Sequence, residues 1–75
     1  MQAHKNQEAL KKFGTRVRQN RLDKGISQEE LAELANVHRT YIGMIERGEK
    51  NITLNTMLNI TNALGIKLTN LIEEL

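Results

Sequence analysis

Apolar side chains recur every three to four positions along almost the whole chain, which is the spacing of one face of an α-helix. Breaks in this pattern fall at polar capping residues and at glycines, which commonly begin and end helices. The pattern predicts an all-α fold without internal repeats. The expected elements are a flexible arm over residues 1–6, a helix over 7–24, two short helices within 28–48, a fourth between Thr53 and Gly65, and a fifth near 68–74.

The segment 28–48 is the most informative part of the chain. Ser27 and Glu30 have the spacing of a capping box at the start of the first short helix. Asn36 occupies a turn position that needs a left-handed backbone, which asparagine tolerates better than most residues. Small or apolar residues stand where the two helices would cross, at Ala32, Val37, Ile42 and Ile45. This arrangement predicts a helix-turn-helix, the motif that places its second helix in the major groove of DNA.

Length and composition exclude several classes of protein. The chain has 75 residues, which suffices for one domain with a modest core, and such domains usually need a partner for comfortable stability. Cysteine is absent and the two histidines are far apart, so neither a disulfide nor a metal site is expected, and no cofactor is implied. No apolar run approaches the roughly 20 residues that span a bilayer. The polar N-terminus has no signal-peptide core, which favours a cytoplasmic protein.

The charges are unevenly distributed, although the net charge is only +2. Basic residues crowd the first third of the chain and recur around the second short helix, whereas acids gather in 29–33 and at the C-terminus. Clustered basic charge is the electrostatic signature of a nucleic-acid partner. Without the pattern in 28–48, an ordinary solvated basic helix would be the preferred interpretation.

With these motifs in place, residues 10–75 resemble the lambda-repressor-like helix-turn-helix family of small five-helix transcription regulators. Within that family, the stretch 38–54, HRTYIGMIERGEKNITL, is similar to the controller proteins of restriction–modification systems. The resemblance implies a compact helix-turn-helix domain over 7–75 with a C-terminal dimerisation helix. It also implies binding to a palindromic double-stranded DNA operator as a homodimer, with RNA polymerase as a further candidate partner.

The residues expected to read bases lie in the first two turns of the second short helix. Arg39 is the sharpest candidate, because an arginine fork matches the O6 and N7 acceptors of guanine, the alternative being a phosphate contact. Thr40 and Tyr41 suit a base or a phosphate equally well. Gly43 suggests close approach to DNA or to another helix, since a mid-helix glycine costs about 1 kcal/mol relative to alanine. Met44 could touch a thymine methyl or pack inside the domain.

The resemblance also places residues around this helix. Gln28 is expected to bind a DNA phosphate, assisted by the positive end of its helix, the alternative being an ordinary residue at a helix start. The loop residues Arg47, Lys50 and Asn51 are expected along the sugar-phosphate backbone, the alternative being an ordinary polar loop. Arg21 is expected to pair with Glu46 and so pin the second short helix, the alternative being two unrelated surface charges.

Two further expectations concern the ends of helices. His38 departs from the serine, threonine or aspartate that usually caps a helix, so a weak cap is expected before Arg39. The apolar residues of the C-terminal helix form a patch too contiguous to leave exposed, so they are assigned to a dimer interface. These residues are Leu68, Leu71, Ile72 and Leu75.

The sequence contains no catalytic constellation. Serine occurs once, as a helix cap, and no nucleophile stands beside a base, so an enzyme is not expected. The preferred function is a sequence-specific dimeric transcription regulator of the restriction–modification controller type. The alternative is an antitoxin-like or phage-type repressor whose main role is to bind a protein partner, which a long disordered tail after the last helix would favour.

Overall fold

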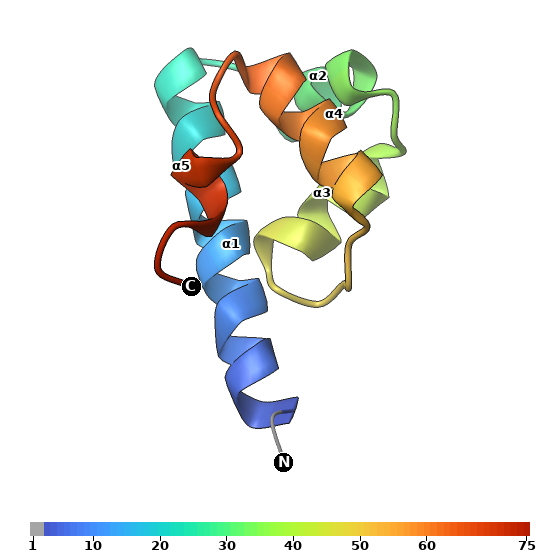
Figure 1. Ribbon diagram of the computed structural model, residues 1–75. Coiled ribbons are helices and arrows are strands. Elements are labelled where there is room, and N and C mark those ends of the chain that lie inside the picture. Colours follow the sequence, from blue (N-terminus) through green and yellow to red (C-terminus); the bar gives the residue numbers. More distant parts are fainter. Residues whose placement is uncertain (1–2) are drawn as a thin grey trace.

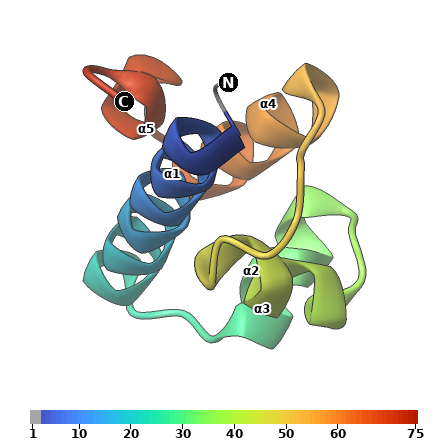
Figure 2. The same ribbon diagram turned by 90° about the horizontal axis from the view of Figure 1, so that it is seen from below.

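A computed structural model describes the backbone of residues 3–75 and the side chains of residues 6–75, and it confirms the all-α fold. The longest helix, α1, packs against α3, α4 and α5, while α2 packs against α3 and α4. Figures 1 and 2 show α5 on one side of α1 and the α2–α3 pair on the other. The helices are α1 (Ala3–Lys24), α2 (Gln28–Ala35), α3 (Arg39–Glu46), α4 (Leu54–Leu64) and α5 (Thr69–Ile72).

Helix α1 begins four residues earlier than the sequence pattern predicted. The helix starts at Ala3, so residues 3–6, which the sequence pattern assigned to an arm, are helical, while residues 1 and 2 lie outside the described chain. The prediction placed the start close to the first apolar residue of the periodic stripe. Residues 3–8 contain no glycine, proline or β-branched residue, so nothing local opposes extension of the helix toward the N-terminus.

The capping signals were predicted correctly for α2 and α4. Ser27 Oγ accepts a hydrogen bond from the Glu30 N–H at 3.0 Å, and Glu30 Oε1 accepts one from the Ser27 N–H at 2.9 Å. Asn36 ends α2 with φ 58° and ψ 45°, the left-handed conformation expected of the turn. Thr53 caps α4 through a hydrogen bond from the Thr56 N–H at 3.1 Å. The ends of α2 and the start of α4 are therefore fixed by interactions between residues close together in the sequence.

The prediction of a weak cap at His38 was wrong. Its Nδ1 atom accepts a hydrogen bond from the Thr40 N–H at 3.1 Å, and its backbone is extended with φ −72° and ψ 142°. A neutral imidazole carries one acceptor nitrogen, so it satisfies an amide at the start of α3 as a serine oxygen would. His38 thus fixes the end of α3 that bears the candidate reading residues.

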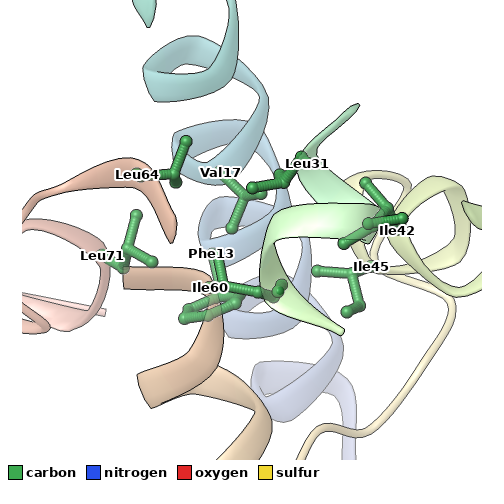
Figure 3. Packing of buried hydrophobic residues seen from close by; sticks show 10 residues of the cluster. Phe13, Val17, Leu31, Ile42, Ile45, Ile60, Leu64 and Leu71 are labelled. Atoms are coloured by element: carbon green, nitrogen blue, oxygen red, sulfur yellow. The ribbon is translucent and has the colours of Figure 1, made fainter. Parts of the chain in front are cut away.

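One hydrophobic core joins all five helices, and Figure 3 shows its side chains converging around Val17 of α1. Ile42 and Ile45 anchor the inner face of α3, while Leu31 does the same for α2. The fully buried or nearly fully buried members are Phe13, Val17, Leu31, Ala32, Ala35, Ile42, Ile45, Ile60, Leu64 and Leu71. This core fixes the orientation of α3 relative to the rest of the domain.

Gly14, which carried no role in the sequence analysis, is the point where α1 crosses α3. A Cβ atom at this position would lie 2.7 Å from the Glu46 carbonyl oxygen and closer still to that of Ile45. Only a residue without a side chain lets the two backbones approach so closely. The glycine interrupts an amphipathic pattern that otherwise predicts an ordinary helix, so the pattern alone does not reveal its purpose.

The C-terminal helix differs from its prediction in length and in role. Helix α5 is a single turn, and Leu71 is fully buried in the protomer's own core. Leu71 is therefore removed from the expected dimer interface, because a domain this small needs it to close its core. Leu68 and Ile72 are half-buried and Leu75 is exposed. Arg16 holds this segment against α1 by donating to the backbone carbonyls of Leu71 and Glu73.

Candidate nucleic-acid interface

A buried ion pair ties α1 to the end of α3. Arg21 Nε donates to Glu46 Oε2 at 2.7 Å and Arg21 Nη2 donates to Glu46 Oε1 at 3.2 Å, so the fork of the guanidinium meets both carboxylate oxygens. Arg21 Nη1 donates to the Ile26 carbonyl oxygen at 2.9 Å. The pair implied by the family resemblance is thus present. Its main effect is to hold one geometry, since desolvation offsets much of the attraction between buried charges.

Gln28, at the start of α2, joins the same network. Its Nε2 donates to Glu46 Oε1 at 3.0 Å, a contact that the sequence analysis did not include. An amide nitrogen carries two hydrogens, so one remains for another acceptor. Glu46 therefore fixes the side chain of Gln28 at the N-terminal end of α2, where the helix dipole favours an anion. The arrangement is compatible with the phosphate contact expected of Gln28.

The N-terminal ends of α2 and α3 together form a groove of about 350 Å³. Two candidate base readers, Arg39 and Thr40, are exposed on it, and Gly43 forms part of its wall. Two candidate phosphate ligands, Gln28 and Arg47, line the same groove. The complete lining is Gln28, Glu29, Arg39, Thr40, Gly43 and Arg47.

Gly43 keeps this groove open. A Cβ atom at this position would lie 3.1 Å from Arg47 Nη1 and 3.6 Å from Gln28 Oε1. Its close neighbours within the protein are therefore the side chains of Arg47 and Gln28. This explains physically why a helix would accept the propensity cost of a glycine at its centre.

The remaining candidate base readers lie outside the groove. Tyr41 and Met44 are half-buried, and the tyrosine packs against the hydrophobic core. Lys50 Nζ lies 5.6 Å from the centre of the Tyr41 ring, a distance at which a cation is attracted to the ring face. This contact links the loop after α3 to α3 itself.

Two other loop residues expected at the DNA backbone face a second cleft. Arg47 Nε lies 3.1 Å from Glu49 Oε2, and both side chains are more than half exposed. Arg47 and Asn51 line a cleft of about 790 Å³ between this loop and α1, which also includes Lys11. Gly48 bends the loop onto α1 with φ 73°, and a Cβ atom there would lie 2.7 Å from Lys11 Cγ.

Sequence reasoning also missed a pair between the first turns of α2 and α3. Arg39 Nη1 donates to Glu29 Oε2 at 2.8 Å, and about two thirds of each side chain is exposed. The two residues are ten positions apart and belong to different helices. No helical spacing rule connects them, because their contact depends on the angle at which the turn sets α3 against α2.

The described part of the chain shows neither a metal-binding group nor a membrane-spanning helix. Its acidic and histidine side chains do not gather in groups of three that could hold a metal ion. Every buried side-chain nitrogen or oxygen among these residues has a hydrogen-bond partner. None of the described helices is long and apolar enough to cross a membrane. The groove between α2 and α3 is the candidate functional site, because candidate base readers and candidate phosphate ligands line it together.

Comparisons with known proteins agree with this geometry. The helix-turn-helix family matches residues 17–71. The chain is 47% identical over 62 residues to the control protein C.BamHI of Bacillus amyloliquefaciens, covering 81% of this chain and 76% of the relative. It is 45% identical over 58 residues to the control protein C.SmaI of Serratia marcescens, covering 77% of this chain and 69% of the relative.

A solved structure supports the same relationship. The crystal structure of the restriction-modification controller protein C.AhdI from Aeromonas hydrophila matches with a TM-score of 0.81 and 45% sequence identity. The match covers 83% of this chain and 94% of that protein. The chain therefore belongs to the helix-turn-helix family of DNA-binding transcription regulators, and within it to the control proteins of restriction–modification systems.

Proposed function

We propose that this protein controls transcription in a restriction–modification system by inserting α3 into the major groove of a palindromic operator. The observation that carries the proposal is the groove between α2 and α3. There, candidate base readers and candidate phosphate ligands lie side by side on helices fixed by a common core. Binding of duplex DNA is the activity that this groove supports, and we place this activity in the cytoplasm.

In this proposal Arg39 and Thr40 read base edges. Both are exposed in the first turn of α3, the part of a recognition helix that enters the groove of DNA first. Arg39 is assigned to a guanine, because its planar fork can donate two parallel hydrogen bonds to O6 and N7. Tyr41 and Met44 are half-buried and take secondary roles at a sugar or a thymine methyl.

The phosphate contacts surround these readers. Gln28 uses its remaining amide hydrogen together with the N-terminal end of α2, where backbone amides favour an anion. Arg47, Lys50 and Asn51 extend the contact along the loop after α3. Such contacts set the position of the protein on the duplex and add affinity that is largely independent of sequence.

A two-fold dimer would match a palindromic operator. Two recognition helices would have to stand about 34 Å apart, one turn of B-DNA, to enter successive major grooves on one face. The exposed side of the C-terminal segment, with Leu68, Ile72 and Leu75, is the proposed centre of that interface. RNA polymerase is proposed as an additional partner at promoters that the protein activates.

The decisive experiment selects a duplex from a random DNA pool with the wild-type protein and then measures affinity for each single-base variant at fixed salt. Arg39→Ala should weaken binding to the selected duplex by about 1–3 kcal/mol and barely affect unrelated DNA. Arg39→Lys should restore charge but only part of the discrimination, because an ammonium lacks the planar fork. An equal loss of affinity for every sequence would make Arg39 a phosphate ligand and refute its assigned role.

A further inference from the structure

The contact between Arg39 and Glu29 leaves one edge of the guanidinium available. A guanidinium has three nitrogens, and two adjacent ones form a fork that can bind two acceptors in parallel. Glu29 engages Nη1, whereas Nε and Nη2 of Arg39 have no partner among the described residues. Arg21 uses this same Nε–Nη2 edge to hold both oxygens of Glu46. The open edge of Arg39 is thus the one that this protein already uses to bind paired acceptors.

We propose that Glu29 is a positioning residue for base recognition, which holds Arg39 through Nη1 and so presents the Nε–Nη2 edge to a guanine. The inference rests on the proposed role of Arg39 as a base reader. It adds a specificity-determining residue that does not itself touch a base. O6 and N7 of guanine are two neighbouring acceptors on one base edge, which is the pattern that a fork of two donors recognises.

Glu29 is well placed to act as the fixed member of this pair. It lies in the first turn of α2, where the helix dipole favours a carboxylate and where the capping box of Ser27 and Glu30 holds the backbone. Arg39 is the longer side chain and has more rotatable bonds. A contact that restricts its rotamers before DNA arrives lowers the ordering cost of binding.

Glu29 has a second, opposite effect on affinity. Its charge lies on the groove that also contains Gln28 and Arg47, so it repels any phosphate that approaches. This repulsion acts on every DNA sequence alike, whereas the positioning effect acts only where a guanine meets Arg39. Discrimination is the ratio of the affinities for two duplexes. A repulsion that weakens both affinities equally cancels in this ratio, so discrimination reports the positioning effect alone.

The experiment compares Glu29→Gln and Glu29→Asp with Glu33→Gln, which removes an exposed charge from the same helix without touching Arg39. The probe is the duplex selected from a random pool by the wild-type protein, together with its single-base variants, and binding is followed by fluorescence anisotropy. The relevant guanine is the base whose replacement weakens binding by the wild-type protein but not by Arg39→Ala.

We expect Glu29→Gln to bind all duplexes more tightly while discrimination at this guanine falls by about two- to five-fold, the range set by an exposed ion pair. Glu33→Gln should tighten binding without changing discrimination. Glu29→Asp keeps the negative charge on a shorter side chain that no longer contacts Arg39. This variant should therefore lose discrimination at the guanine, while its affinity for duplexes without that guanine stays unchanged. In an Arg39→Ala background, Glu29→Gln should have no effect on discrimination.

The outcomes separate the two proposals. Unchanged or increased discrimination in Glu29→Gln would overturn the inference and leave the role of Arg39 intact. If no base depends on Arg39, then the assigned role of Arg39 fails and the inference fails with it. The fold is not at risk in either variant, since most of the Glu29 side chain is exposed to solvent.

Discussion

The same methyl group, added at Gly14 or at Gly43, should change stability in opposite directions. In Gly14→Ala the new Cβ would lie 2.7 Å from the Glu46 carbonyl oxygen and closer still to that of Ile45. Ordinary contact begins at 3.4 Å, so α1 and α3 would have to separate by more than about 0.7 Å. The atoms in the way belong to the backbone of α3 and cannot rotate aside. In Gly43→Ala the nearest atom is Arg47 Nη1 at 3.1 Å, the end of a flexible and exposed side chain.

These geometries set the expected magnitudes. Overpacking costs about 1–3 kcal/mol, and the upper end applies at Gly14 because the three atoms nearest the new methyl group all belong to the backbone. The gain in helix propensity from glycine to alanine offsets about 1 kcal/mol of this, which leaves a net loss near 2 kcal/mol. For a domain of this size, the loss lowers the melting temperature by roughly 8–16 °C. Gly43→Ala keeps the propensity gain and should raise the melting temperature by roughly 4–8 °C.

Thermal unfolding followed by circular dichroism at equal protein concentration measures both shifts. DNA binding provides a second measurement, because the methyl group in Gly43→Ala enters the groove between Gln28 and Arg47. That variant should therefore be more stable than the wild type and bind its selected duplex less tightly. A Gly14→Ala protein that melts at the wild-type temperature would refute the close crossing of α1 and α3, and with it the reasoning that places the end of α3.

One further prediction concerns the proposed DNA interface and another concerns the proposed dimer interface. Lys50→Ala should weaken binding to all sequences alike and flatten the dependence of log K on log salt by about 0.9 per protomer, whereas Lys67→Ala, outside the interface, should leave the slope unchanged. An unchanged slope for Lys50→Ala would place this lysine away from the phosphates. Sedimentation should detect a dimer at micromolar concentration that Leu75→Glu weakens, and a protein that stays monomeric with and without the selected duplex would contradict the dimer.

Much of the fold could be predicted because its determinants are local in sequence. The capping box at Ser27 and Glu30, the left-handed Asn36 and the cap at Thr53 each involve residues no more than a few positions apart. Such signals bound α2, the turn and α4 without any knowledge of tertiary packing. The apolar stripe also predicted which face of each helix is buried, since residues such as Ile42 and Ile45 repeat at helical spacing.

The features that escaped prediction depend on contacts between distant residues. In the sequence, Leu71 cannot be distinguished from the other leucines of an amphipathic helix. It is buried within the protomer because the core of this small domain needs it. Gly14 matters because the carbonyls of Ile45 and Glu46 lie against it, more than thirty positions away. The pair of Glu29 and Arg39 depends on the angle between α2 and α3, which no periodicity in the sequence specifies.

The supports of α3 are distributed unequally along its length, and this difference has a functional consequence. Its C-terminal end is held by Glu46, which is buried against Arg21, and by the crossing at Gly14. Its N-terminal end, which carries Arg39, combines the buried Ile42 with exposed polar contacts of Arg39 and His38. The exposed contacts orient the reading residue, whereas the buried contacts set the position of the helix. Substitutions at the buried end should therefore alter affinity for every sequence, whereas those at the exposed end should alter which sequence is preferred.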